Sequence, residues 1–331
     1  MTRRTATWAL IGLLAAGCAT NDQAPLGGST EAIEPQPASF VVWVAGEPRP
    51  IETKTVTFRD PGGYDAYLET CHFDPSQVLP KRPSAGCDTV KRYRARPGGE
   101  DGMSPTEIRE RIHQFVLHYD VCITSRRCFE VLHDLRGLSV HFMLDLDGTL
   151  YQTLDLAERA RHAGFANDAS IGIEIAHPGA FPPGNESWRK YYRDDADGRR
   201  VIDPPAKLGP PEGGPFVLAR QEDFRGVING SPYVMADFTE GQYRALEALV
   251  DFLCREFPRL RREAPRAADG TISPDFLGRD AGESFEGILG HWHVSERKQD
   301  PGPAMDWDRI LRTSPLHGGI SGSSASPANS P

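Results

Sequence analysis

Ser170-Ile171-Gly172-Ile173-Glu174-Ile175 is the stretch that decides the fold, because its large apolar residues recur at every second position. This alternation is typical of a β-strand, in which successive side chains point to opposite faces of a sheet. It places the three isoleucines on one face and the carboxylate of Glu174 on the other. The acid is either a solvated strand residue or a functional group, and the strand alone does not decide between the two.

Helices and further strands are expected on both sides of this strand. Ser104 before a proline, with Glu107 three positions on, is typical of a helix start, and Thr239 with Gln242 repeats the pattern. The other expected elements are a strand at 115–117, a helix at 125–135 that stops at Gly137, strands at 139–146 and 149–154 joined by an Asp147-Gly148 turn, and an amphipathic helix at 240–257. This order predicts an α/β (α+β) domain, with a central mixed β-sheet flanked by helices.

Metal-ligating side chains follow the strands. The strand at 115–117 ends in His118, and a loop at 290–303 reads Gly-His-Trp-His-Val-Ser-Glu-Arg-Lys-Gln-Asp-Pro-Gly-Pro. Two histidines and one carboxylate, with a fourth position left to water, are the ligand set of hydrolytic zinc. Taken singly, His118 fits a structural histidine as well, and Asp300 fits a turn residue. Their combination predicts a zinc site at the C-terminal ends of the strands.

Bulk properties narrow the class of protein. A chain of 331 residues can bury one large core or two modest ones. Its net charge of -9 at pH 7 argues against a nucleic acid as the main partner. No apolar run beyond the N-terminus is long enough for an internal membrane span.

The N-terminus has the pattern of an export signal. Arg3 and Arg4 precede an apolar stretch at 8–16, and small residues then lead into Cys18. The small residues before a cysteine resemble a bacterial lipobox, which implies cleavage before Cys18 and its lipidation; the alternative is an ordinary signal peptide. Ala19 after the cysteine suggests sorting to the outer membrane. We therefore expect an exported protein, lipid-anchored on the periplasmic face of that membrane.

Composition divides the chain into segments. Gly, Pro and polar residues mark flexible stretches, whereas apolar periodicity marks the folded part. The expected divisions are 1–17 signal peptide with lipobox, 18–38 tether, 39–100 N-terminal extension of unknown role, 101–312 main domain and 313–331 disordered tail. Within the main domain we expect an insertion at about 178–233 that the core does not need, and a polar loop at 264–285.

Export would permit disulfides among the five cysteines after Cys18. Cys71 could bridge to Cys87, and Cys122 could bridge to Cys128, because the members of each pair are close in sequence. Cys254 would then remain unpaired. The alternative is that all five are reduced thiols, because spacing does not fix connectivity.

Five motifs in order give the chain a family resemblance. They are FVLHY at 115–119, SVHFMLDLDGTLYQ at 139–152, RHAGFAND at 161–168, SIGIE at 170–174, and the loop that begins GH at 290 and ends RKQDPGP at 303. Together they resemble the type-2 family of zinc-dependent N-acetylmuramoyl-L-alanine amidases, relatives of the peptidoglycan recognition proteins and phage-type amidases. The lipobox makes the lipoprotein branch of that family the best fit.

The resemblance implies roles for particular residues. His118, His291 and Asp300 would be the ligands of Zn²⁺, Glu174 the general acid/base, and Lys298 the cation that stabilises the transition state. Taken from the residues alone, Lys298 fits an exposed basic pair with its neighbour equally well.

The resemblance also implies less specific roles for further residues near the site. His293 is the alternative to His291 as ligand, and the Gly-His step favours His291. His162 and Asn167 would contact the substrate, and His141 would pack beside the site or support the ligands. Where the family usually has an aromatic residue before the His-Ala-Gly step, this chain has Arg161.

The implied reaction is hydrolysis of the amide between N-acetylmuramic acid and L-alanine of the stem peptide, in cell-wall turnover or recycling. The implied partner is peptidoglycan or a muropeptide; we expect a monomer and no nucleic acid. One rival is a non-catalytic peptidoglycan-binding module of the same fold. Another is a zinc peptidase acting on the stem peptide, although the chain has no HExxH helix.

Overall fold

The computed structural model describes residues 40–74, 92–99 and 102–312. The chain divides after Ala38 into two units, and every described residue lies in the second. Three predicted segments lie outside the described residues. They are the signal peptide, the tether that begins at Cys18, and the C-terminal tail.

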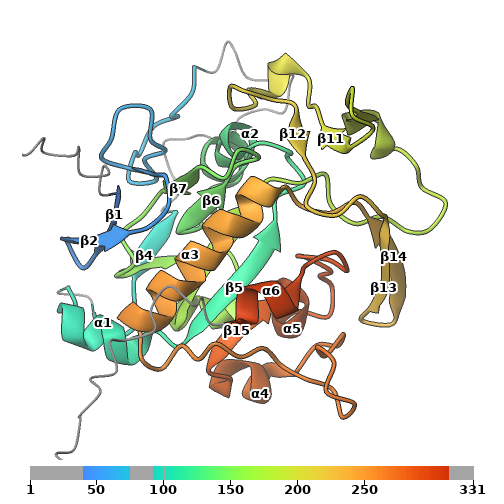
Figure 1. The fold of residues 1–331 in the computed structure, drawn as a ribbon. Coiled ribbons are helices and arrows are strands. Elements are labelled where there is room, and N and C mark those ends of the chain that lie inside the picture. Colours follow the sequence, from blue (N-terminus) through green and yellow to red (C-terminus); the bar gives the residue numbers. More distant parts are fainter. Residues whose placement is uncertain (1–39, 75–91, 100–101, 313–331) are drawn as a thin grey trace, which may run out of the picture. The chain divides into compact units, whose positions relative to one another are not determined.

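A six-stranded mixed sheet forms the centre of the fold, as predicted (Figure 1). In spatial order its strands are β15 (Gly287–Gly290), β5 (Gln114–Tyr119), β9 (Ser170–Ile175), β6 (Phe142–Leu144), β7 (Leu150–Gln152) and β3 (Thr55–Thr57). Neighbouring strands run parallel except β6 and β7, which form the hairpin expected at Asp147-Gly148. The α/β (α+β) prediction is confirmed.

Helices cover both faces of this sheet. The isoleucines of β9 pack in one apolar cluster with α3 (Glu240–Glu256), which begins at the Thr239–Gln242 capping box and lies across the sheet in Figure 1. Met143 of β6 packs in a second cluster with α2 (Ser125–Phe129) on the opposite face. Glu174 points to the side of α2, because it alternates with the isoleucines.

The N-terminal extension is part of this domain. Its hairpin of β1 (Phe40–Val44) and β2 (Glu47–Ile51) contributes Val42 and Val44 to the main apolar cluster. Its β3 forms an edge strand of the central sheet beside β7. Its β4 (Tyr93–Ala95) pairs with β8 (Glu158–Ala160). The extension therefore helps to build the core.

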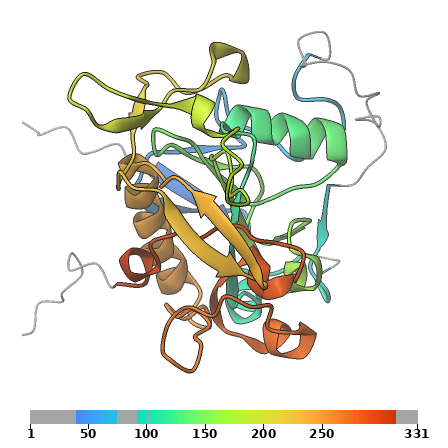
Figure 2. The same cartoon turned by 90° about the vertical axis from the view of Figure 1, so that its right-hand side faces the viewer.

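The insertion folds into strands rather than loops. These are β10 (Tyr192–Asp194), β11 (Arg200–Ile202) and β12 (Phe216–Val217) in one small sheet, and the hairpin of β13 (Phe224–Ile228) and β14 (Ser231–Met235), which is seen in Figure 2 beside the C-terminal segment. Trp188 and Leu218 belong to an apolar cluster of this segment, but Ala180 and Ile228 join the main cluster. The expectation that the core does not need the insertion is therefore wrong.

The remaining helices are short. They are α1 (Pro105–Arg111) with its Ser104 cap, α4 (Arg279–Ser284), α5 (His291–Val294), α6 (Trp307–Leu311), and the 3-10 turns Gly164–Asp168, Arg189–Tyr191 and Ala206–Leu208. The expected loop at 264–285 thus contains a helix, α4. The helix expected at 125–135 continues from α2 as a π-helical segment, Glu130–Arg136, that ends at Gly137 in the left-handed conformation.

The cysteines follow neither expectation completely. Cys71 is disulfide-bonded, and Cys87 lies outside the described residues. Cys122 and Cys128 are free thiols, so the possible bridge between these two residues is not formed; Cys254 is also free. Within the described ranges no helix has the length and apolar character needed to cross a membrane.

Candidate metal centre and active site

Three predicted ligands converge at one edge of the sheet. His118 lies near the end of β5, His291 begins α5 directly after β15, and Asp300 lies in the loop that follows. Because β5 and β15 are parallel neighbours, their C-terminal ends meet and bring the two histidines together. The His118 Nδ1 atom lies 2.9 Å from His291 Nδ1, and Asp300 Oδ2 lies 3.0 and 2.8 Å from the two nitrogens.

The donor set suits a divalent cation. Tetrahedral zinc with bonds of about 2.0–2.1 Å keeps its ligand atoms roughly 3.3 Å apart. The observed separations of 2.8–3.0 Å are near that value. All three residues are buried, and within the described ranges they form a group of ligand atoms able to hold one ion. This group could therefore hold a divalent cation.

The local electrostatics favours the protonation states that a metal requires. Burial lowers the pKa of His118 to about 4, and the nearby His291 adds to this effect. Burial alone would raise the pKa of Asp300, but the electrostatic interaction with the neighbouring His291 and the hydrogen bonds with both histidines lower it strongly. At neutral pH the His118 ring is therefore neutral and Asp300 is ionised, as metal binding demands.

His293 lies two residues from His291, but both of its ring nitrogens form hydrogen bonds with backbone atoms. Its Nδ1 accepts a hydrogen bond of 2.9 Å from the backbone of Gly290, and its Nε2 donates one of 2.8 Å to the carbonyl of Ser273. Both ring nitrogens are thus occupied away from the ligand group. The geometry favours His291 as the ligand.

Glu174 and Lys298 border the same cavity as the ligands. Glu174 of β9 lies directly opposite His118 of β5 in the sheet register, so the two side chains share a face. Burial raises the pKa of Glu174 well above its usual range, Asp300 adds to the rise, and Lys298 opposes it. Asn229 of the β13–β14 hairpin donates a hydrogen bond of 3.0 Å to the backbone carbonyl of Lys298.

The cavity has a volume of about 640 Å³, large enough for a sugar–peptide fragment. Its charged lining includes four cationic side chains, namely Arg136, Arg161, Arg297 and Lys298. It also holds the carboxyl groups of Asp120, Glu174 and Asp300. The four cationic side chains in this lining suit a substrate that carries carboxylates.

His162 and Asn167 line this cavity and also make contacts within the protein. The His162 Nδ1 atom lies 3.0 Å from His118 Nε2, on the side of that ring away from the ligand group. The Asn167 side chain accepts hydrogen bonds of 3.1 and 2.7 Å from the backbone of His162 and Ala163. Both residues therefore support the site from behind as well as lining it.

His141 lies behind the site and is fully buried. Its Nδ1 accepts a hydrogen bond of 3.1 Å from the backbone of Gly172, and its Nε2 lies 3.0 Å from the carbonyl of Glu158. Gly172 has no room for a side chain, since a Cβ there would lie 2.5 Å from the His162 ring. The ring of His141 thus fixes the backbone of β9 two residues before Glu174.

Asp120 is a site residue that the sequence did not single out. Its Oδ1 accepts hydrogen bonds from the backbone of Cys122, Ile123 and His177, at 2.9, 2.9 and 3.0 Å. It thereby fixes the loop that leaves β5 next to the ligands. An aspartate that precedes a turn is a known signal for this bonding.

The sequence comparison identifies the family. The family model described as N-acetylmuramoyl-L-alanine amidase, Amidase_2, matches residues 108–303, more than half of the chain. The chain belongs to this amidase family. The matched range contains all three residues of the ligand group, as well as Glu174 and Lys298. The enzyme is therefore an N-acetylmuramoyl-L-alanine amidase, and its substrate is peptidoglycan or a muropeptide.

Solved structures are similar to the amidase only distantly. A selenomethionine derivative of AmpD shares 19% identity with a TM-score of 0.33, over 68% of this chain and 92% of that one. AmiD from E. coli, in complex with anhydro-N-acetylmuramic acid-L-Ala-D-gamma-Glu-L-Lys, shares 19% identity with a TM-score of 0.34, over 60% of this chain and 56% of that one. The endolysin LysCS from Clostridium intestinale URNW shares 14% identity with a TM-score of 0.31, over 61% and 83%. No curated protein matches the chain. The family assignment rests on the sequence match.

Proposed function

We propose that the amidase is zinc-dependent and acts in cell-wall turnover or recycling. The observation that carries the metal is the approach of His118 Nδ1, His291 Nδ1 and Asp300 Oδ2 to within 3.0 Å of one another. A zinc ion held there would polarise the scissile carbonyl and make a water molecule more acidic. The bond to be cleaved joins the lactyl group of N-acetylmuramic acid to L-alanine.

Glu174 is proposed as the general acid/base. It borders the cavity beside His118, and its raised pKa suits a group that takes a proton from the attacking water. The same carboxyl would then return this proton to the amine nitrogen of the departing L-alanine. Proton transfer of this kind typically contributes about 10²–10⁴-fold to the rate.

Lys298 is proposed to stabilise the negative charge that develops on the carbonyl oxygen. It borders the cavity two residues before Asp300, and its charge already acts on Glu174 and His118. An ammonium group positioned before the reaction begins favours the tetrahedral state over the planar amide.

Digestion of purified sacculi tests this function. The expected fragments have a new N-terminal L-alanine and intact stem peptides, and a chelator should abolish their release until zinc is added back. New ends within the stem peptide would instead indicate a peptidase. Retention on sacculi without products would indicate a binding module.

We also propose export, with a lipid anchor on Cys18 at the periplasmic face of the outer membrane. The support is the sequence of the basic residues Arg3 and Arg4, the apolar stretch at 8–16 and the lipobox-like residues before Cys18. Metabolic labelling with a fatty acid should mark the wild type but not Cys18→Ala, and fractionation should move the variant to the soluble periplasm. Light scattering of the protein without its anchor should give the mass of a monomer.

A further inference from the structure

Arg96 of the N-terminal extension is a buried arginine with an unusual set of partners. Its exposed fraction is 1%, and within the described ranges it makes no ion pair with a carboxylate. Its guanidinium instead donates to four backbone carbonyls, those of Asn167, Asp168, Leu156 and Ser170, at 3.0–3.2 Å, and it lies 3.3 Å from Nε2 of His141. The planar guanidinium suits this task, because its N–H groups spread in fixed directions.

Three of these carbonyls lie in the segment that leads into β9. The 3-10 turn Gly164–Asp168 and the first residue of β9 are held from behind by the one guanidinium. Two side chains of this segment then contact His162. The Asn167 side chain accepts a hydrogen bond from the backbone N–H of His162, and the Ser170 hydroxyl lies 3.2 Å from Nε2 of its ring. Arg96 therefore fixes two residues that fix His162.

His162 in turn contacts His118, one of the proposed zinc ligands. When His118 offers the lone pair of Nδ1 to a cation, its proton must lie on Nε2, which donates to His162 Nδ1 at 3.0 Å. The proton of His162 then lies on Nε2 and donates to Ser170. Hydrogen bonds of this type set the tautomer and orientation of a ligating imidazole. Each ring nitrogen in the series has a compatible partner.

We propose that Arg96 is a positioning residue for the metal centre: through Ser170 and Asn167 it holds His162, which orients His118. The extension thereby has a role in the site without touching the substrate. This inference rests on the proposed zinc site, but it concerns how tightly zinc is held and not which bond is cleaved.

Zinc affinity of the full chain, measured by competition with a chromophoric chelator, tests the proposal. Arg96→Met keeps an unbranched apolar stem but is shorter and has no donors, and Ser170→Ala removes only the hydroxyl that meets His162. Loss of such support typically weakens metal binding by about 10–100-fold, and we expect a change of this size for both variants. Because both act through His162, the double variant should lose less than the product of the two single effects.

Arg92 provides a matched control. It is also buried, with an exposed fraction of 4%, and it donates to the carbonyls of His133 and Leu68, two residues outside the segment that leads into β9. Arg92→Met should lower the thermal midpoint as Arg96→Met does, yet hold zinc within about threefold of the wild type. Cobalt substitution adds a second readout, since a reoriented His118 should alter the visible absorption of the Co²⁺ form in Arg96→Met only.

Several results would overturn the inference. Wild-type zinc affinity in a folded Arg96→Met would make the arginine merely structural, and equal weakening in Arg92→Met would mean general softening of the domain. If Arg96→Met does not fold, unchanged affinity in Ser170→Ala would refute the route through His162. A wild-type chain that does not bind zinc would remove the metal proposal itself, which is a distinct result.

Discussion

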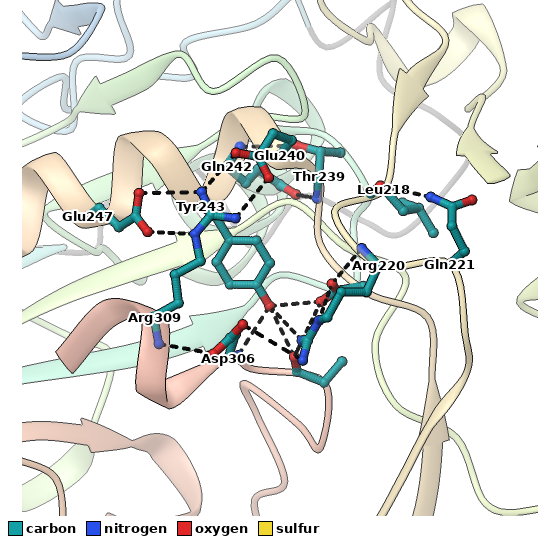
Figure 3. A network of polar contacts seen from close by, with 12 residues as sticks. Leu218, Arg220, Gln221, Thr239, Glu240, Gln242, Tyr243, Glu247, Asp306 and Arg309 are labelled. Carbon is teal, nitrogen blue, oxygen red and sulfur yellow. Dashed lines mark hydrogen bonds and ion pairs between the residues drawn. The ribbon is translucent and has the colours of Figure 1, made fainter. Parts of the chain in front are cut away.

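Arg220 and Asp237 form an ion pair that joins the insertion to the core, and its removal should have a measurable cost. Figure 3 shows the network. The Asp237 side chain is fully buried and receives hydrogen bonds from the Arg220 guanidinium at 2.7 and 3.0 Å, while the Tyr243 hydroxyl donates to it at 2.7 Å. Arg220 and Tyr243 also donate to the carbonyl of Ala304, just beyond Asp300.

Arg220→Met should destabilise the protein by about 2–3 kcal/mol. Breaking a fully buried pair costs about 3–5 kcal/mol because a charge remains without its partner. The Arg220 side chain is 31% exposed, and Asp237 keeps the Tyr243 donor, so we take a smaller value. In a domain of this size the thermal midpoint should fall by roughly 5–10 °C.

Urea unfolding and thermal scans of the zinc-loaded protein measure this cost. The matched control is Arg199→Met in the same insertion, whose ion pair with Asp195 is exposed and should contribute about 0–1 kcal/mol. Arg220→Met combined with Asp237→Asn should be more stable than Arg220→Met alone, because the unpaired buried charge is gone. A loss no larger than that of the control, or a double variant less stable than Arg220→Met, would refute the reasoning.

Three further predictions concern the site and its surroundings. Glu174→Gln should keep zinc but lower kcat on muropeptides by about 10²–10⁴-fold; full turnover would exclude the acid/base role. His291→Ala should lose zinc in the chelator assay, whereas His293→Ala should keep most of it and lose stability; the reverse result would exchange their roles. Burial lowers the pKa of His177 from 6.5 to about 3, so the unfolded chain binds a proton that the folded chain excludes. Stability should therefore fall as the pH drops below 6.5, by about 2 kcal/mol more between pH 7 and 5 in the wild type than in His177→Asn. Parallel losses in urea unfolding at the two pH values would contradict this pH dependence.

Features decided within a few residues could be predicted from the sequence. The capping boxes at Ser104 and Thr239 form as expected, because donor and acceptor lie three residues apart. The alternation in 170–175 places Glu174 opposite the isoleucines, because a strand permits no other arrangement. The proximity of His118 and His291 was also predicted, since they lie at the ends of two strands that the sheet brings together.

Contacts between segments that are far apart in the sequence could not be predicted, because no local sequence pattern indicates them. The short strand β3 lies beside β7 only because the extension folds back on the domain, and nothing in residues 55–57 indicates that neighbour. The proposed role of Arg96 depends on hydrogen bonds to backbone carbonyls. Every residue has a carbonyl, so the amino-acid types of its partners do not indicate these bonds. The contact of His162 with His118 was not predicted, because the sequence does not show which side chain lies behind the ring of a ligand; its predicted contact with the substrate stays a prediction.

Arg96 and Arg220 show why the extension and the insertion belong to the same folding unit as the motifs. Each supplies a guanidinium from outside the motifs, and each donates to backbone carbonyls near a ligand-bearing segment, at Asn167 and at Ala304. A guanidinium is charged at neutral pH, and its five N–H donors lie in a fixed plane, so it satisfies several carbonyls at once. The motifs supply the atoms that would bind the metal, but the precision with which those atoms are held depends on segments that carry no motif. Excision of either segment should therefore loosen the ligand group even where the central sheet still forms.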